Sequence, residues 1–497
     1  MKAPEATGTA VPSWMVAHDR LFIGGRWVPG TGEVIEVVSP TTEQVIARVP
    51  SASVADMALA VQAARHALDT GPWPQLELAE RLALVAELAR LMRAEQEAIA
   101  QLITAEMGCP ITQSRTIQAV TPVRVVESYL QIARQHPFRE IRRSSTGAAL
   151  VTREPVGVVA AVTPWNVPLG ISTQKVVPAL IAGCTVVLKP APQTPLVGYL
   201  LAQLVERAGF PPGVLNVVPA DRAASERLVS HPGVDKVTFT GSTAAGRRIA
   251  ALCGNDLRRV SLELGGKSAA VVLDDADLEQ AVAALQMGAF RNNGQVCTLK
   301  TRILVSPRRE AELVERLAAM VGGLAVGDPR QDATDIGPVV SADQRARVEG
   351  YIASGRDEGA TLVTGGGRPA GQDRGWFVEP TVFSDVSPDM LVSREEIFGP
   401  VVAVTRYRDE AEAVALANDT PYGLSGAVFT ADLERGLRVA GRMRTGVVEL
   451  NGAPIGLGAP FGGFKDSGLG RENGPEGLDA FTELRSIGLP GDFRPTL

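Results

Sequence analysis

The stretch Gly157-Val158-Val159-Ala160-Ala161-Val162, followed at once by Thr163-Pro164-Trp165-Asn166, sets the pattern for the middle of the chain. A short apolar run that ends in a proline-marked turn is typical of a strand buried on both faces of a parallel sheet. Four more runs of this kind follow, with room for helices between them, at 184–189, 214–218, 235–239 and 259–264. The alternation predicts a doubly wound α/β sheet of the dinucleotide-binding (Rossmann-like) kind.

Helix signals stand between and before these runs. The segment Pro195–Ala208 is expected to be a helix, because Thr194 offers an N-cap, proline suits the first helical position and Gly209 follows the end. Ser53 and Asp56 form a capping-box pattern that predicts a helix to about residue 69. A longer helix is expected from Leu78 to beyond Leu102, stopped by Gly108 and Pro110.

Polar residues stand where the predicted parallel strands end. Asn166 follows the first strand, Lys189 ends the second, and Gly241-Ser242 follow the fourth. Since ligands of doubly wound sheets bind beyond the carboxyl ends of the strands, we expect a ligand site at this edge. A second α/β alternation begins at 268–273 and continues to about residue 447, with a helix at 278–291.

The helix at 278–291 leads into Asn292-Asn293-Gly294-Gln295-Val296-Cys297-Thr298. A cysteine that follows Asn, Asn, Gly and Gln has surroundings that suit a thiol meeting a ligand, so Cys297 is a candidate nucleophile. The alternative is a small buried hydrophobe, which we expect for Cys184 in its apolar run. Cys109 and Cys253 stand next to glycines and are expected near helix ends.

Glu263, in Leu262-Glu263-Leu264-Gly265-Gly266-Lys267, is a candidate general base. Strand alternation would aim it opposite to its two leucine neighbours, and an apolar, glycine-rich setting favours a raised carboxyl pKa. The alternative is a strand-end glutamate that faces solvent. Asn166, bracketed by Pro164 and Pro168, is a candidate oxyanion donor, with a plain turn asparagine as the alternative.

Composition limits the class of protein. A chain of 497 residues exceeds one hydrophobic core, so two or three domains are expected. A net charge of −6 without a dense Lys/Arg run gives no reason to expect nucleic-acid binding. The polar N-terminus Met1–Glu5 and the short apolar runs predict no export signal and no membrane span, so the cytoplasm is the expected location. Four cysteines do not make a disulfide framework, and the four histidines lack metal-ligand spacing, so no metal site is expected.

Together with the segments around Cys297 and Glu263, five further motifs make the chain resemble the aldehyde dehydrogenase superfamily. They are Thr163-Pro164-Trp165-Asn166, Leu188-Lys189-Pro190, Phe239-Thr240-Gly241-Ser242-Thr243, Glu395-Glu396-Ile397-Phe398-Gly399-Pro400 and Pro460-Phe461-Gly462-Gly463-Phe464-Lys465. The resemblance implies NAD(P)-dependent oxidation of an aldehyde to a carboxylate, in which Cys297 forms a thiohemiacetal and then a thioester. Asn166 would hold the oxyanion and Glu263 would activate water.

The resemblance also implies further site residues. Those expected at the cofactor, NAD with NADP as a possibility, are Thr163, Pro164, Trp165, Lys189, Gly241, Ser242, Gly246, Leu264, Glu396 and Phe398. For Glu396 and Phe398 the alternative is a surface acidic pair beside a core phenylalanine. Residues expected along the substrate tunnel are Val167, Gly170, Gln174, Val296, Thr298 and Phe461. The small residues among them favour a medium-chain, terpenoid or aromatic aldehyde.

Three positions depart from the family pattern. Leu299 stands where a small residue is common, two places after the cysteine. Pro192 stands where many NAD-preferring members have an acidic residue that accepts the ribose hydroxyls, which leaves NADP use open. Pro475 stands at the position matched to a relay glutamate of some members, with Glu476 beside it, so the resemblance leaves a proton relay here open.

The resemblance also implies a domain division. The cofactor domain would comprise 20–136 and 156–267, the catalytic domain 268–447, and a small β oligomerisation element 137–155 and 480–497, with 448–479 returning to the cofactor domain along the tunnel. A homodimer or homotetramer is expected. Two other classes stay open: a cofactor-independent cysteine hydrolase or acyltransferase, which needs a histidine partner, and a non-catalytic binding protein on the same fold.

Overall fold

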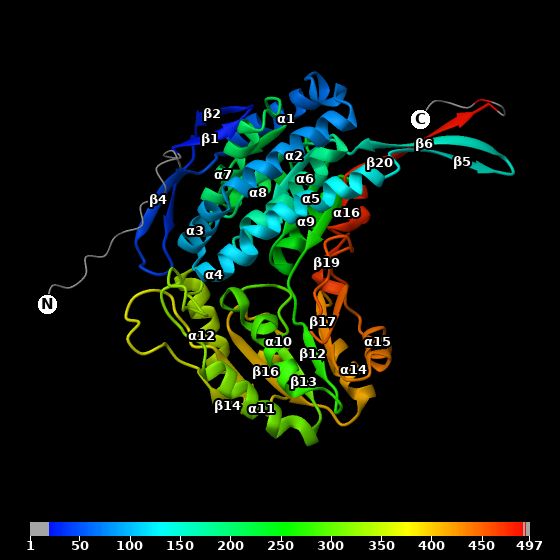
Figure 1. Cartoon of the computed structure of the whole chain (residues 1–497). Coiled ribbons are helices and arrows are strands. Elements are labelled where there is room, and N and C mark those ends of the chain that lie inside the picture. The colour runs from blue at the N-terminus through cyan, green and yellow to red at the C-terminus, as the bar shows by residue number, and fades with distance from the viewer. Residues whose placement is uncertain (1–18, 491–492, 494–497) are drawn as a thin grey trace.

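The computed structural model describes residues 19–490 and 493. Figure 1 shows two α/β bodies and a thin β-arm that projects from the upper body. The predicted polar N-terminus and residues 491–492 and 494–497 of the predicted terminal element lie outside the described residues. None of the helices in the described part is long and apolar enough to cross a membrane.

The upper body is built on an eight-stranded sheet in the order β19-β11-β10-β7-β8-β9-β1-β2. The five central strands are parallel, as the apolar runs predict. From β7 the chain adds β8 and β9 on one side, and it then returns to add β10 and β11 on the other side. The direction of strand order therefore reverses between β7 and β10, which is the topological switch point of the sheet. The strands are β1 Arg20–Ile23, β2 Arg26–Pro29, β7 Val158–Val162, β8 Thr185–Lys189, β9 Leu215–Val217, β10 Lys236–Thr240, β11 Arg259–Glu263 and β19 Gly468–Leu469.

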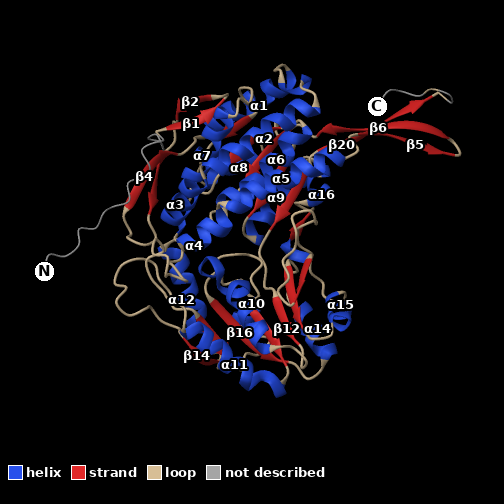
Figure 2. Ribbon diagram, in the orientation of Figure 1, coloured by secondary structure: helices blue, strands red, loops and turns tan. Residues whose placement is uncertain are grey.

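Helices cover both faces of this sheet (Figure 2). They are α1 Val54–Asp69, η1 Trp73–Gln75, α2 Leu78–Ala94, α3 Gln96–Met107, α4 Ile111–Gln113, η2 Ser114–Gln118, α5 Val120–Gln135, α6 Pro168–Ala182, α7 Pro195–Arg207, α8 Arg222–Val229, α9 Thr243–Asn255 and α16 Gly474–Asp479. The single long helix predicted from Leu78 is wrong, because the chain breaks at Glu95 into α2 and α3. Gly108 ends α3 in the left-handed conformation.

Two predicted helix caps have different outcomes. The capping box of Ser53 and Asp56 is present at the start of α1. Thr194 stands at the N-cap position of α7, but its hydroxyl makes no capping bond. Instead the Leu196 N–H donates to Oε1 of Glu106, on α3, at 2.8 Å. Burial raises the pKa of Glu106 to about 8. This long-range cap could not be predicted from local sequence.

The lower body is built on a seven-stranded sheet in the order β14-β15-β16-β13-β12-β17-β18. Its strands are β12 Ala269–Val272, β13 Arg302–Val305, β14 Thr361–Thr364, β15 Thr381–Ser384, β16 Val401–Arg406, β17 Ser425–Phe429 and β18 Val447–Leu450. Its helices are α10 Leu278–Phe290, η3 Arg291–Gly294, α11 Pro307–Gly322, α12 Ala342–Asp357, α13 Leu391–Arg394, α14 Glu410–Asn418 and α15 Leu433–Ala440. A boundary at residue 447 would cut through β18, so this unit extends to Leu450.

The β-arm is a three-stranded sheet in the order β20-β6-β5. Its strands are β5 Arg139–Ser144, β6 Gly147–Pro155 and β20 Thr482–Leu489, so the two predicted segments pair with one another. The arm extends away from both bodies (Figure 1). A separate hairpin pairs β3 Val34–Val38 with β4 Val45–Pro50. The segment η4 Lys465–Ser467 leads into β19, which pairs with β11 and returns the chain to the upper sheet.

Candidate active site

A cavity of about 260 Å³ lies beyond the carboxyl ends of β7, β10 and β11, at the switch point of the upper sheet. This is the edge at which doubly wound sheets bind ligands. Residues of the lower body close the cavity from the other side. Its lining is Pro164, Trp165, Asn166, Thr240, Gly241, Ser242, Leu264, Gly265, Cys297, Gln344, Arg347, Glu396 and Phe398.

The loop that carries Cys297 has an unusual backbone. After α10 ends at Phe290, Asn292, Asn293 and Gly294 have φ values of +54, +60 and +77°. Asparagine is one of the few residues that tolerate this left-handed conformation. A side chain at Gly294 would lie 2.1 Å from the carbonyl carbon of Gly399, so the loop packs tightly against the 396–400 segment.

The polar residues before the cysteine hold the loop and do not face a ligand. Asn292, Asn293 and Gln295 are all buried. The amide of Asn293 donates to the carbonyls of Gly108 and Pro338, at 2.9 and 2.8 Å. The side-chain oxygen of Gln295 accepts from the Val340 N–H at 2.9 Å. The polar residues that pointed to this loop in the sequence therefore serve to hold its backbone, and were not placed there to meet a ligand.

Cys297 is half-buried, whereas Cys109, Cys184 and Cys253 are fully buried. Its sulfur is thus the thiol most accessible to a ligand. Burial and the nearby carboxylates of Glu396 and Glu263 raise its pKa to about 12, although Arg291 acts in the opposite direction. The thiol is therefore protonated in the free protein at neutral pH, and attack requires a proton acceptor.

Asn166 is held against the cysteine loop. Its side-chain N–H donates to the Gln295 carbonyl at 2.9 Å, and its own carbonyl accepts from the amides of Gln118 and Asn292. The amide has a second N–H, which this bond leaves available. Because Asn166 and Cys297 line the same cavity, the structure brings these two predicted residues together.

Glu263 ends β11 and is buried, so the solvent-facing alternative is wrong. Its Oε2 atom is buried without a hydrogen-bond partner among the described residues. Burial, together with the charge of Glu472, raises the pKa of Glu263 well above its usual value. Three residues further on, a side chain at Gly266 would lie 2.4 Å from the Cys297 carbonyl oxygen, so the segment after this strand packs against the backbone of Cys297.

Two residues near Glu263 were not predicted. The Lys175 ammonium, fully buried in α6, pairs with the Glu472 carboxylate at 2.5 Å. Both charges act on Glu263. Pro475, the position matched to the family's relay glutamate, and Glu476 beside it are both exposed, whereas Glu472 is buried and bonded to Lys175. The sequence did offer one sign of this pair, since Lys175 is the single lysine in the apolar run of α6 and a buried lysine needs a carboxylate partner.

A second cavity of about 500 Å³ continues along the sheet, and Ser242 lines both cavities. Lys189 is buried in its wall, and burial lowers the pKa of Lys189 to about 8. Its ammonium makes no hydrogen bond or ion pair with the described residues. Pro192 lines the same cavity. Ser242 caps α9 by accepting from the Ala245 N–H, so the N-terminus of this helix stands between the two cavities.

Glu396 and Phe398 lie in the first cavity, and the surface-pair alternative is wrong for them. The Gly266 N–H donates to Oε1 of Glu396 at 3.0 Å. Burial raises the pKa of Glu396 to about 7. Phe398, with φ of +61°, stands edge-on to Trp165, with ring centroids 5.3 Å apart. The lining residues Gln344 and Arg347 were not predicted; they donate to the carbonyls of Phe398 and Glu396 and fix this segment.

Two predicted cofactor residues line neither cavity. Thr163 is buried, and its N–H donates to the Lys189 carbonyl at 3.1 Å. Gly246 is buried in α9, where a side chain would lie 2.4 Å from Leu264. Gly246 therefore allows α9 to pack closely on the end of β11. Gly246 thereby helps to position α9, whose N-terminus lies between the two cavities, and does not itself line either of them.

The predicted tunnel residues cluster near Cys297 and Glu472. Val167 precedes α6, Gly170 and Gln174 lie on α6, and Val296 and Thr298 flank the cysteine. The Gln174 amide donates to the Asn473 side chain at 3.4 Å. Phe461 exchanges two backbone hydrogen bonds with Glu472. The chain between β18 and α16 thus brings Phe461 to the side of α6.

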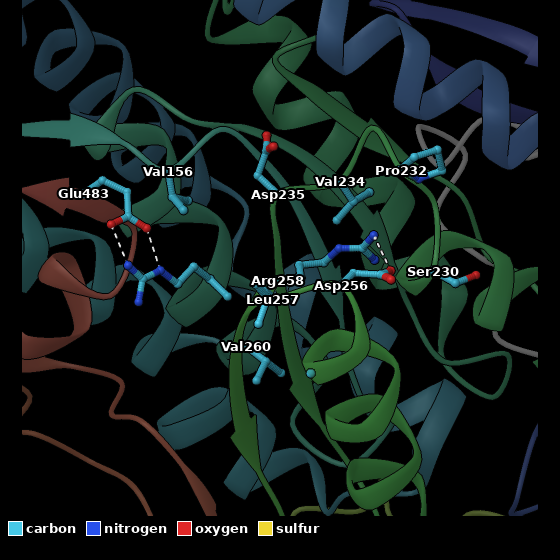
Figure 3. Close-up of a pocket in the computed structure, with 12 residues that line it drawn as sticks. Val156, Ser230, Pro232, Val234, Asp235, Asp256, Leu257, Arg258, Val260 and Glu483 are labelled. Atoms are coloured by element: carbon cyan, nitrogen blue, oxygen red, sulfur yellow. Dashed lines mark hydrogen bonds and ion pairs between the residues drawn. The ribbon is translucent and has the colours of Figure 1, made fainter.

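A third hollow, of about 1030 Å³, opens at the amino ends of β10 and β11, where the arm joins the sheet (Figure 3). Two ion pairs lie within it. Arg259 donates two hydrogen bonds to the Glu483 carboxylate, and Arg258 pairs with Asp256. None of the site residues lines it. The candidate active site is therefore the smaller cavity at the carboxyl ends.

Comparison with known proteins agrees with this geometry. The model of the aldehyde dehydrogenase family matches residues 27–487. A geranial dehydrogenase from Castellaniella defragrans is 45% identical over 478 residues, which cover 96% of this chain and 100% of the relative. A betaine aldehyde dehydrogenase from Rhizobium leguminosarum is 41% identical over 94% of this chain and 96% of its own length.

Solved structures give the same result. An aldehyde dehydrogenase from Mycobacterium tuberculosis, complexed with NAD+, superposes with a TM-score of 0.95 at 44% identity, covering 96% of this chain and 99% of its own. Aldehyde dehydrogenase C from Pseudomonas syringae, a variant solved with NAD+ and octanal, has a TM-score of 0.93 at 40% identity, covering 96% and 98%. The chain therefore belongs to the aldehyde dehydrogenase family and is an NAD(P)-dependent aldehyde oxidoreductase.

Proposed function

We propose that this protein oxidises an aldehyde to a carboxylate by covalent catalysis at Cys297, with Asn166 as oxyanion donor and Glu263 as general base. One observation carries the assignment. An accessible thiol lines the cavity at the switch point of a dinucleotide-binding sheet, and a buried carboxylate with an unpaired oxygen, at the end of a strand of that sheet, lies within electrostatic range of it. A nucleophile and a base in one place are the minimum for acyl chemistry.

The two cavities have the chemistry that a nicotinamide dinucleotide needs. The unpartnered ammonium of Lys189 suits ribose hydroxyls, and the N-terminus of α9 at Ser242 suits the pyrophosphate. A side chain at Gly265 would lie 2.5 Å from Glu396, so this glycine keeps the first cavity open beside that carboxylate. We assign Glu396 to the nicotinamide ribose and Phe398 to the ring. When bound, the dinucleotide accepts a hydride from the substrate carbon.

In the acylation step, the Cys297 sulfur forms a bond to the aldehyde carbon as the thiol proton passes to water and on to solvent. The free N–H of Asn166 and the backbone N–H of Cys297 donate to the developing oxyanion. Such preorganised donors are usually the largest single contribution to a step of this kind. The bonds from Asn166 to the Gln295 carbonyl and from Gln118 and Asn292 to the Asn166 carbonyl hold this donor in place before substrate arrives.

In the hydrolysis step, Glu263 takes a proton from water as the water oxygen bonds to the thioester carbon and the Cys297 thiolate leaves. A carboxylate with a raised pKa is a stronger base than an ordinary one. Lys175 and Glu472 tune the proton affinity of Glu263, since the charge of Glu472 raises its pKa and that of Lys175 lowers it.

A cofactor-independent cysteine hydrolase fits the site less well. Its cysteine would need a histidine, and none of the three histidines in the described part of the chain lines either cavity. A non-catalytic binding protein would have no use for an unpaired buried carboxylate, which costs free energy to maintain.

We propose a medium-chain, terpenoid or aromatic aldehyde as substrate. Val167, Gly170 and Gln174 leave α6 without aromatic side chains, and Phe461 is the main bulky wall residue. The geranial dehydrogenase at 45% identity and the relative solved with octanal support this size class. Rates with acetaldehyde, octanal, geranial and benzaldehyde, followed by absorbance of the reduced coenzyme, test it. A strong preference for acetaldehyde would refute the size class, and no reduction of either coenzyme would refute the function.

NADP+ is proposed as a second coenzyme, because Pro192 places no carboxylate beside Lys189 to repel a 2′-phosphate. Asp221 caps α8 and Glu226 pairs with Arg248, so both lining acids are engaged. The Pro192→Glu substitution adds a carboxylate beside Lys189. Since a phosphate monoester carries about −1.5 to −2 charges at neutral pH, NADP+ binding should weaken by about tenfold or more.

Titration of tryptophan fluorescence with each coenzyme measures the dissociation constants without turnover. NAD+ affinity should stay within about threefold, because Pro192→Glu adds a hydroxyl acceptor and no phosphate clash. The Pro192→Ala variant is the control, since it removes the ring without adding charge. Equal weakening of NADP+ binding in both variants would contradict the electrostatic explanation.

The domain roles follow from these assignments. We propose that the upper body, residues 20–136 and 156–267, binds the cofactor, and that the lower body, from 268 to β18, supplies the nucleophile. The return segment 448–479 would line the tunnel. The arm would serve a homodimer or homotetramer, because it extends from the body and exposes Leu484 and Ile487. Exposed apolar side chains on a β-ribbon favour a protein partner.

A further inference from the structure

Tyr129 is a buried tyrosine of α5 whose hydroxyl contacts the segment that carries Glu472. Its side chain is 1% exposed, and its oxygen accepts a hydrogen bond from the Asn473 N–H at 2.9 Å. The helix α5 packs against both α6, which carries Lys175, and α16, which starts at Gly474. The phenol therefore joins the helices of the upper body to the backbone directly after Glu472.

The backbone of Asn473 needs such an anchor, because it is strained. Its φ of +59° and ψ of 172° lie in a region that only glycine enters readily, and a residue stays there only when its surroundings fix it. Two side-chain contacts do so. The Asn473 N–H donates to Tyr129, and the Asn473 side chain accepts from Gln174 on α6 at 3.4 Å. The bond to Tyr129 is the shorter and the more deeply buried of the two.

The packing around the hydroxyl leaves little room for this segment to move. A side chain at Gly477 would lie 2.4 Å from the Tyr129 oxygen and 3.0 Å from the Glu472 carbonyl carbon, so this glycine lets the three groups meet. Glu472 also exchanges two backbone hydrogen bonds with Phe461, and its carboxylate pairs with Lys175 at 2.5 Å. The Tyr129 hydroxyl is thus one of the contacts that fix where this carboxylate stands, and it is the one made from α5.

The position of Glu472 matters because its charge acts on Glu263. Burial and the charge of Glu472 raise the pKa of Glu263, whereas the charges of Lys175 and Arg471 lower it. The other titratable groups within electrostatic range of these two carboxylates are Cys297 for Glu263, and Tyr129 and Lys236 for Glu472. Movement of Glu472 away from Lys175 would weaken its own effect and leave the ammonium unpaired, and both changes favour the ionised form of Glu263.

We propose that Tyr129 is a positioning residue for hydrolysis of the acyl-enzyme, because its hydroxyl holds Asn473 in the strained conformation that keeps Glu472 in place. The inference rests on the proposed function, in which Glu263 is the hydrolytic base. Tyr129 lines neither of the two cavities, so acylation and coenzyme binding should not depend on its hydroxyl.

The Tyr129→Phe variant removes only the hydroxyl and leaves the Asn473 N–H without its acceptor. Glu472 should then lose its fixed place, and the rise of the hydrolysis rate with pH should occur about 0.5 unit or more lower than in the wild type. Decay of the acyl-enzyme, formed with octanal and NAD+ and quenched at intervals for mass spectrometry, measures this rate across pH. The rate of the burst of reduced coenzyme should stay within about threefold of the wild type, because acylation does not involve Tyr129.

A double-variant cycle shows whether Tyr129 acts through Glu472. In the Glu472→Gln background the Tyr129→Phe substitution should produce no further shift, since the charge that it would displace is already gone. Tyr407→Phe is the matched control, because the Tyr407 hydroxyl is also buried and donates one bond, to the Val272 carbonyl at 2.8 Å in the lower body. This control should lose thermal stability as Tyr129→Phe does, but its pH profile should not change.

Gly477→Ala tests the same contact without changing Tyr129, which covers the case in which Tyr129→Phe fails to fold. The added methyl would displace the Tyr129 oxygen, so the rise should again occur at lower pH. Gly322→Ala, whose methyl meets no atom within 4 Å, should leave the rise in place.

Two results would overturn the proposal while the proposed function stands. One is a rise that Glu472→Gln moves but that neither Tyr129→Phe nor Gly477→Ala moves. The other is a Tyr129→Phe shift that is as large in the Glu472→Gln background as in the wild type. If Glu472→Gln does not move the rise either, the assignment of Glu263 as base fails, and the proposal fails with it.

Discussion

The Cys297→Ser variant should lose aldehyde oxidation by about 10³-fold or more, because no other group in the cavity can form the acyl intermediate. The other three cysteines are buried in the core and cannot replace it. A serine hydroxyl is far less acidic than a thiol, and the site raises even the thiol pKa to about 12. Steady-state rates with octanal and NAD+ measure the loss.

Binding separates loss of chemistry from loss of fold in this experiment. Cys297→Ser should bind NAD+ as the wild type does, since the sulfur lines one end of the cavity and makes no contact that shapes the rest. Cys253→Ala is the matched control, because it changes a buried cysteine on α9 and should keep its activity. Retention of full turnover by Cys297→Ser would disprove the nucleophile assignment.

Much of this site could be predicted because the parallel strands carry a local signal. Each of the five apolar runs forms the strand it predicts, and their parallel order brings Asn166, Gly241 and Glu263 to one edge. The capping box at Ser53 is likewise a local pattern with a local cause. Residues whose placement depends on strand ends were therefore identified without any knowledge of tertiary contacts.

The rest depends on contacts between distant segments. The partner of Lys175 is Glu472, which no spacing along the chain could reveal. The cap of α7 comes from Glu106 on another helix, and not from the adjacent Thr194. The break at Glu95 lies within one apolar periodicity, so the pattern alone suggested a single helix.

The Glu263→Gln variant should acylate normally and then release product slowly. Glutamine keeps the shape of the side chain but cannot accept a proton from water, so steady-state turnover should fall by about 10²- to 10⁴-fold. Rapid mixing should show a burst of reduced coenzyme that matches the amount of enzyme, followed by a slow phase. The control is Glu476→Gln, the same change at an exposed glutamate. Absence of the burst, or wild-type turnover, would exclude Glu263 as the hydrolytic base.

The pH dependence of hydrolysis also tests whether Glu263 is the base, because it predicts the direction in which the pH profile should shift. Glu263 acts only when ionised, and burial with the charge of Glu472 raises its pKa. The hydrolysis rate should therefore rise with pH through that raised pKa and level off above it. Glu472→Gln removes the negative charge and leaves Lys175 unpaired, and both changes favour the ionised form of Glu263. The rise of the hydrolysis rate with pH, which forms the acidic limb of the profile, should then occur at lower pH. In Glu476→Gln the position of this rise should not change. A limb that does not move, or that moves to higher pH, would show that the titrating base is not Glu263.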